Sequence, residues 1–223
     1  MAISKFNYNS FNVTPVAGKA LSFNSDADGF TTQSSSSMVL IKTLTASSSA
    51  NLSFVHGSSD VVLDSTYPVY RFVFTNCHPA NNEQQLYMGG SVNSGSNYES
   101  TAKTTTCFRA FHTEGGSSGT LAYYTGGDVA QGTEAAFLSV EASNENDHGV
   151  SGTFTLFNPS STTFVKHFLS SSNAVYNDSS DTTMNFYVAG YFNTTSAING
   201  IRFRFNTGNM DAGTIKLYGI KDS

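Results

Sequence analysis

The residues that decide the fold class run from Ile198 to Ile220 and read INGIRFRFNTGNMDAGTIKLYGI. They contain two runs in which apolar and polar side chains alternate, IRFRF at 201–205 and IKLY at 215–218. In a strand, successive side chains point to opposite faces, so each run predicts a strand with one apolar face. The intervening residues 206–213 are rich in Asn and Gly, which favour turns. The stretch therefore predicts an antiparallel pair near the middle of an all-β domain.

Similar short runs recur from Met38 onward, separated by clusters of Gly, Ser, Asn and Asp. Further strands are expected at Met38–Thr45, Asn51–Val55, Val61–Leu63, Val69–Phe74, Gln85–Val92, Cys107–His112, Phe137–Val140, Gly152–Phe157, Phe164–Leu169 and Met184–Tyr191. Many short strands of this kind are typical of sandwiches and barrels. We therefore expect an all-β, jelly-roll-type antiparallel β-sandwich, with a short helix expected only at Gly132–Leu138.

The alternation also predicts which side chains point inward. The expected inward set is Val39, Ile41, Phe72, Phe74, Phe154, Leu156, Phe164, Phe168, Phe203, Phe205, Ile215 and Leu217. Residues 1–37 differ from the rest, because they include the turn-like Asp26–Gly29 and end in the low-complexity Ser34–Ser37. Poly-Ser is typical of flexible linkers. Residues 1–37 are therefore expected to form an N-terminal arm and linker that packs on its own domain or on a neighbour, and residues 38–223 the sandwich.

The composition excludes several classes of function. Only 12% of the residues are charged and the net charge is -5, whereas binding to nucleic acid or to an anionic membrane needs clustered Lys and Arg. No apolar stretch approaches the ~20 residues that span a bilayer, and the N-terminus shows no apolar signal region. Cys77 and Cys107 are expected to be reduced, buried thiols of a protein made in the cytoplasm.

No motif points to a cofactor or to catalysis. None of the five His stands in a spacing typical of a zinc or iron site, so we expect no metal and no cofactor. The segment Asn144–His148 could hold a hard cation through oxygen atoms or could equally be a solvated loop. Nothing in the sequence selects one pair of carboxylates for glycosidase chemistry. A non-enzymatic function is therefore expected.

Four long polar loops are expected, at Asn93–Thr106, Gly115–Thr133, Ala142–Ser151 and Ser170–Asp181. They contain Tyr98, Tyr123, Tyr124 and Tyr176 among Asn, Asp, Ser and Gly. Rigid aromatic rings among small polar residues suit recognition of flat sugar faces, although the tyrosines could equally pack over the bases of their loops. We predict a contact surface in which Tyr123 and Tyr124 stack on a ligand while Asp128 and His148 form hydrogen bonds.

Three segments support a family resemblance: Met38–Ser47, Phe157–Phe168 and Asp211–Ile220. With Phe108–His112, Ala189–Tyr191 and Asn193–Ile198 between them, they resemble a family of virion structural proteins of marine tailed phages, notably phages of cyanobacteria, often labelled tail fibre. The resemblance covers about 38–221. It implies a protein made in the cytoplasm of a bacterial host and incorporated into a virion. The family has no defined catalytic residues, so the resemblance assigns none here.

These observations give three expectations for function. The first is a tail fibre or receptor-binding protein whose loops contact carbohydrate on the host surface. The second is a capsid decoration protein on the same fold, and the third is a polysaccharide-degrading enzyme. In the first two cases the partners are other virion proteins and further copies of the chain. A homotrimer is expected, because fibre and decoration proteins commonly use three-fold symmetry.

Overall fold

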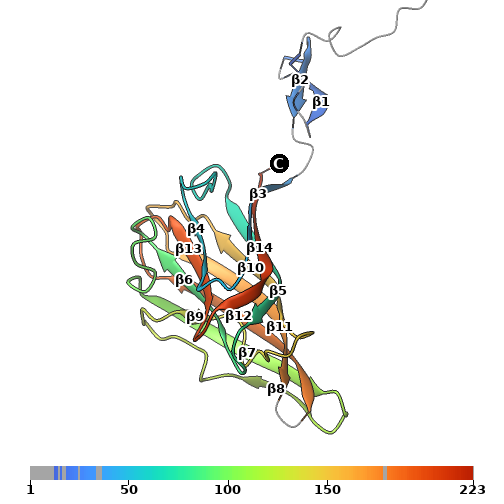
Figure 1. The fold of residues 1–223 in the computed structure, drawn as a ribbon. Helices are drawn as coiled ribbons and strands as arrows, with labels where there is room; N and C mark the ends of the chain where they lie inside the picture. The colour runs from blue at the N-terminus through green and yellow to red at the C-terminus, as the bar shows by residue number, and fades with distance from the viewer. Residues whose placement is uncertain are drawn as a thin grey trace, which may run out of the picture.

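The computed structural model describes residues 13–14, 16, 19–24, 26–33, 37–177 and 180–222. Within these residues the secondary structure consists of strands and turns, without a helix (Figure 1). The strands are β1 (Ala20–Phe23), β2 (Phe30–Gln33), β3 (Met38–Thr45), β4 (Leu52–Val55), β5 (Val69–Pro79), β6 (Leu86–Ser91), β7 (Lys103–Thr113), β8 (Gly119–Tyr123), β9 (Ala136–Phe137), β10 (Val150–Phe157), β11 (Lys166–Asn177), β12 (Asp181–Phe192), β13 (Gly200–Phe205) and β14 (Met210–Ile220). The predicted all-β class is confirmed.

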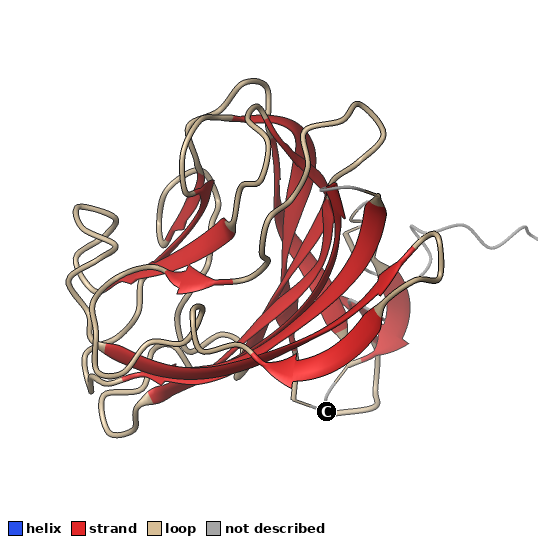
Figure 2. Cartoon of the chain, turned by 90° about the horizontal axis from the view of Figure 1, so that it is seen from below, coloured by secondary structure: helices blue, strands red, loops and turns tan. Residues whose placement is uncertain are grey.

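Two antiparallel sheets face each other across the core (Figure 2). The larger sheet has the strand order β3-β14-β5-β10-β11-β12-β7-β8, and the smaller has the order β4-β13-β6-β9. From β3 to β6 the chain changes sheet at every step, and it does so again from β9 to β10 and from β13 to β14. Eight strands wound in this way, as β3-β14-β5-β10 against β4-β13-β6-β9, form a jelly roll. The predicted jelly-roll sandwich is therefore confirmed, and β11, β12, β7 and β8 extend its larger sheet.

The predicted pairing of the two C-terminal strands is wrong. β13 pairs with β4 and β6 in the smaller sheet, whereas β14 pairs with β3 and β5 in the larger one. The two strands instead face each other across the core, which is why both have a buried apolar face. Alternation reports which side of a strand is buried but not which strand lies beside it.

The core is built around aromatic rings from both sheets. The ring centre of Phe203 on β13 lies 5.2 Å from that of Phe72 and 6.0 Å from that of Phe154, both on the larger sheet. Most of the expected inward residues are buried in this core, namely Phe72, Phe74, Phe154, Leu156, Phe168, Phe203, Phe205, Ile215 and Leu217. Val39 and Ile41 are half-buried. Phe164 is 69% exposed, so its prediction is wrong, because it lies in the bend before β11 rather than in the strand.

The segment 124–149 covers the inner face of the added strands. It contributes Val129, Leu138 and Val140 to the hydrophobic core. Its main chain accepts hydrogen bonds from the strands that it covers, such as the bond from Ser172 Oγ on β11 to the carbonyl of Leu138. The buried ammonium group of Lys103 donates to two more carbonyls of the segment, those of residues 133 and 134. The segment thus buries the inner face of β11, β12 and β7, as the smaller sheet buries the inner face of the jelly-roll strands.

Several predicted boundaries need correction. Val61–Leu63 is buried but is not a strand, and Gly132–Leu138 is not a helix. Much of the expected loop Ser170–Asp181 belongs to the hairpin formed by β11 and β12. These errors share a cause, since burial and polarity in short segments are set by distant neighbours rather than by local sequence.

Part of the expected N-terminal arm is described. β1 and β2 form a separate two-stranded hairpin beyond the end of the sandwich where the C-terminus lies (Figure 1). The predicted turn at Asp26–Gly29 connects them, and Asn24 Oδ1 accepts hydrogen bonds from the main-chain N–H groups of Asp28 and Gly29. Residues 1–12 and most of Ser34–Ser37 lie outside the described residues.

Candidate functional site

The structure separates the two tyrosines that were expected to act together. Tyr123 is the last residue of β8 and is 52% exposed on the outer face of the larger sheet. Its hydroxyl donates a hydrogen bond of 2.7 Å to Asp128 Oδ2, and this bond raises the pKa of Tyr123. Tyr123 and Asp128 therefore do lie together, as a pair already bonded to each other.

Tyr124 follows Tyr123 but lies on the inner side, half-buried against the core. Its ring packs edge-on against Phe186 at 5.8 Å, and the guanidinium of Arg109 lies 4.6 Å from its centre. Burial raises the pKa of Tyr124. Neighbouring residues on an extended chain point to opposite sides, so the two rings do not form one stacking surface. Tyr124 packs over the base of its loop, which is the alternative that the sequence left open.

The other two loop tyrosines are also packed. Tyr98 is 6% exposed, with the guanidinium of Arg202 4.7 Å from its ring centre. Tyr176 lies on β11 rather than in a loop, and it packs against the core. Tyr98, Tyr124 and Tyr176 therefore do not form an exposed aromatic surface for ligand stacking.

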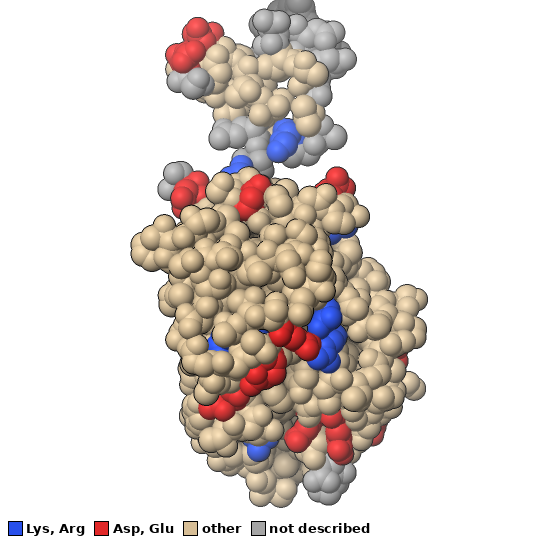
Figure 3. Space-filling model, turned by 90° about the vertical axis from the view of Figure 1, so that its left-hand side faces the viewer, with Lys and Arg blue, Asp and Glu red and all other residues tan. Residues whose placement is uncertain are grey.

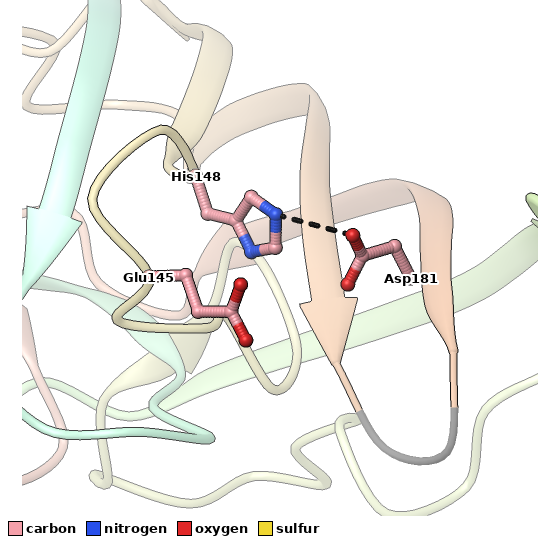
Figure 4. Close-up of side chains that lie close together, drawn as sticks. All are labelled: Glu145, His148 and Asp181. Atoms are coloured by element: carbon pink, nitrogen blue, oxygen red, sulfur yellow. Dashed lines mark ion pairs between the residues drawn. The ribbon is translucent and has the colours of Figure 1, made fainter.

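His148 belongs to a different cluster, which the structure assembles with Glu145 and Asp181 (Figure 4). A tight turn, closed by a hydrogen bond of 2.9 Å from the N–H of His148 to the carbonyl of Glu145, brings the first two side chains together. Asp181 begins β12 and reaches the cluster from the neighbouring hairpin. One ligand-type atom from each of the three side chains lies within 4.8 Å of those of the other two. Sequence reasoning missed Asp181, because a strand pair rather than a local motif places it there.

His78 on β5 holds the turn in position. Its Nδ1 lies 2.7 Å from Asp211 Oδ1, and its Nε2 lies 2.9 Å from the carbonyl oxygen of Glu145. Both partners are acceptors when Asp211 is ionised, so a neutral ring can donate to one and a doubly protonated ring to both. The turn is thus tied to the ends of β5 and β14 by a side chain that is charged only when protonated.

Beside this cluster lies a hollow of about 710 Å³, here called the polar hollow. Its walls are rich in amide, carboxylate, hydroxyl and imidazole groups. The polar side chains that line it are Asn76, His78, Asn146, Asp147, His148, Ser151, Asn173 and Asp211. It contains His148 from the predicted contact surface but not the other three residues.

Tyr123 is well separated along the sheet from the cluster that contains His148. Tyr123 pairs with Phe108, which pairs with Tyr187, whereas Asp181 of the cluster lies six residues before Tyr187 on β12. At about 3.3 Å per strand residue, this offset is roughly 20 Å. The predicted surface therefore corresponds to two distinct places on the molecule.

A second exposed feature is apolar and lies on the outer face of the larger sheet. The rings of Phe108 and Tyr187 stack there with centres 4.9 Å apart, and Leu169 is 52% exposed beside them. Together with Leu121 and Tyr123 they are here called the outer patch. A hollow of about 330 Å³ within it is lined by uncharged residues. The alternation in β7, β11 and β12 places Phe108, Leu169 and Tyr187 opposite the core, but no motif in the sequence marks them as a surface.

Comparisons of the chain with protein-family profiles, with curated proteins and with solved structures find no match in any of the three. Among the described residues there is also no helix of the length and apolarity that a membrane-spanning helix needs. The function therefore has to be inferred from the geometry of the chain itself. It offers a recessed polar surface at one end of the sandwich and an apolar surface on one face.

Proposed function

We propose that the chain is a non-enzymatic virion protein, a tail fibre or receptor-binding component, whose loop end contacts carbohydrate on the surface of a bacterial host. The observation behind this proposal is the polar hollow. Sugar hydroxyls both donate and accept hydrogen bonds, and the hollow offers amides that do both next to carboxylates that accept. The segments that resemble phage virion proteins support the virion context.

The test changes two side chains of the polar hollow that are exposed or half-exposed, Asn146 and Asn173. The variant Asn146→Ala with Asn173→Ala should bind host cells or isolated host surface polysaccharide about tenfold more weakly, because each lost hydrogen bond contributes about 0.5–1.5 kcal/mol. Asn51→Ala is the matched control, since Asn51 is exposed and lies outside the hollow. Equal binding by the natural protein, the double variant and Asn51→Ala would show that the polar hollow does not bind the carbohydrate.

The larger assembly follows from the outer patch. A contiguous exposed apolar surface marks a site of association, and the hollow within this one has no charged wall. We propose that the hollow within the outer patch receives the edge strand β8 of another copy of the chain, where Leu121 is 69% exposed. A contact between a face and an edge is head-to-tail, and such contacts form a ring when the rotation between copies closes. A homotrimer is the ring that we propose, joined to other virion proteins.

Two other functions remain open as alternatives with their own tests. A capsid decoration protein would bind purified capsids and not host cells, and a cryo-EM map of the particle would locate it on the head. A polysaccharide-degrading enzyme is favoured by one distance, because the carboxylates of Glu145 and Asp181 lie within 4.8 Å. Retaining glycosidases hold their two carboxyl groups about 5–5.5 Å apart. Release of reducing sugar by the natural protein, lost in Asp181→Asn, would establish this alternative.

A further inference from the structure

We propose that Glu145, His148 and Asp181 form a binding site for a divalent transition-metal ion of the Zn²⁺ type, which joins the turn at residues 145–148 to the hairpin of β11 and β12. This inference does not depend on the proposed function. It adds a ligand to a site for which the sequence suggested either a hard cation bound through oxygen atoms or a solvated loop.

The observation that points to an ion is the imidazole of His148. Its side chain is only 8% exposed, and its Nδ1 atom is buried without a hydrogen-bond partner among the described residues. A buried polar nitrogen normally has a partner, because removing it from water otherwise costs free energy. Figure 4 shows the Nδ1 edge of the ring turned toward the carboxylate of Glu145, while Nε2 is turned toward Asp181. An ion would supply the missing partner.

The spacing of the groups fits ligands around one ion better than hydrogen bonds between them. Nε2 of His148, the nitrogen that would not bind the ion, lies 3.6 Å from Asp181 Oδ2, which is longer than a normal hydrogen bond, so that carboxylate is not held by the ring. Two ligands that are each about 2.0–2.1 Å from a tetrahedral Zn²⁺ lie about 3.4 Å from each other, somewhat closer than the separation of up to 4.8 Å in the cluster. The three residues need only small side-chain rotations to meet at one point, since their ligand atoms already lie within 4.8 Å.

The donor set indicates the class of ion. One imidazole nitrogen and two carboxylate oxygens are ligands of Zn²⁺ and its first-row neighbours, whereas Ca²⁺ takes six to eight oxygen atoms. The side chain of Asn177 donates to Glu145 Oε1 from the neighbouring hairpin, as outer partners of metal-bound carboxylates do. With three protein ligands, a fourth position is left for water or for a ligand oxygen atom.

Such an ion would connect parts of the chain that are far apart in sequence. The turn that carries Glu145 and His148 lies between β9 and β10, and Asp181 opens β12. Asp147 and His148 also line the polar hollow, so the ion would fix one of its walls. Bound Zn²⁺ should therefore protect the turn at 145–148 against limited proteolysis.

The experiment measures metal binding to the full-length chain without any carbohydrate. Isothermal titration calorimetry with ZnCl₂ should give one ion per chain with a micromolar dissociation constant, and CaCl₂ should bind much more weakly. The variants His148→Ala and Asp181→Asn should each raise the dissociation constant for Zn²⁺ at least about tenfold. His167→Ala is the matched control, because His167 is exposed and outside the cluster, and its binding should equal that of the natural protein.

Co²⁺ provides a second measurement, because its visible absorption reports the coordination of the ion. The natural protein and His167→Ala should give the intense bands of a low-coordinate Co²⁺ site, and His148→Ala should not. Circular dichroism of the metal-free variants checks that they fold, and Asp181→Asn tests the site should His148→Ala fail to fold. The proposal is overturned if the natural protein binds no Zn²⁺ at millimolar concentration, or if His148→Ala and Asp181→Asn bind it unchanged. If the natural protein binds Zn²⁺ but has no affinity for host carbohydrate, the proposed function is refuted and the metal site stands.

Discussion

At the scale of single residues, the most informative side chain is the buried ammonium group of Lys103. It is fully buried under the covering segment, where it donates to the carbonyls of residues 133 and 134. Burial lowers its pKa to about 8, although the nearby carboxylates of Glu134 and Glu99 oppose that shift. Because its bonds hold the segment over the sheet, its protonation affects the stability of the fold.

Stability should therefore gain a contribution from Lys103 as the pH rises above 8. The unfolded chain keeps this proton up to a pKa of about 10.4, whereas the folded chain loses it near 8, so the unfolded state binds more protons between these values. Between pH 7.5 and 9.5 the free energy of unfolding of the natural protein should rise by roughly 1–2 kcal/mol relative to that of Lys103→Met. Urea unfolding of both proteins measures this difference.

The comparison with Lys103→Met is needed because other buried groups act in the opposite direction. Burial raises the pKa of Cys77 to about 12 and that of Cys107 to about 11, so both lower the stability as the pH rises past 9. Their contribution is present in both proteins and cancels. A difference in unfolding free energy that stays constant with pH would show that Lys103 does not titrate in this range.

At the scale of elements, β13 and β14 show how a correct pattern can lead to a wrong neighbour. Both strands have the predicted apolar face, and both faces are buried. The turn between them carries the chain from one sheet to the other instead of closing a hairpin. The apolar faces of both strands therefore line one core, and Phe203 of β13 is the point at which rings from β4, β5 and β10 converge.

This position predicts a large cost for removing the ring. Phe203→Ala should destabilise the fold by about 3–5 kcal/mol, because a cavity opens among the rings of Phe54, Phe72 and Phe154. Phe164→Ala is the control, and it should change stability by less than about 0.5 kcal/mol because that ring is exposed. Thermal or urea unfolding gives both values, and equal effects would contradict the assignment of the core.

At the scale of the whole molecule, charge is scarce and scattered. Figure 3 shows the acidic and basic side chains as small groups on a face that is otherwise uncharged. Long-range charge attraction therefore offers little to association, and buried apolar area has to supply most of its free energy. The outer patch is an exposed surface of the required kind.

Light scattering should give a mass near three times 23.8 kDa for the full-length chain. Leu169→Asp should convert this species to a folded monomer at micromolar concentration, because a charge in the outer patch would have to be buried on association. Leu40→Asp is the control, since Leu40 is equally exposed at 52% but lies on β3 at the far edge of the same sheet. A natural protein that remains at 23.8 kDa would refute the trimer.

The sequence by itself determined the all-β class, most strand positions and most inward faces. Alternation in stretches such as 201–205 and 69–74 follows from the two-residue repeat of a strand, which is a local property of the chain. Even the first strand of the sandwich, Met38–Thr45, begins and ends as the pattern predicts. The jelly roll then follows as a common way to bury many short strands of this kind.

The tertiary structure decided what depends on distant neighbours. It placed β13 and β14 in opposite sheets, turned Tyr124 into the core and left Tyr123 on the outer face. It also brought Asp181 beside Glu145 and His148, although more than thirty residues separate them in the sequence. The physical reason is that alternation fixes which face of a strand is buried, whereas pairing and closure of the two sheets fix which residues share a site.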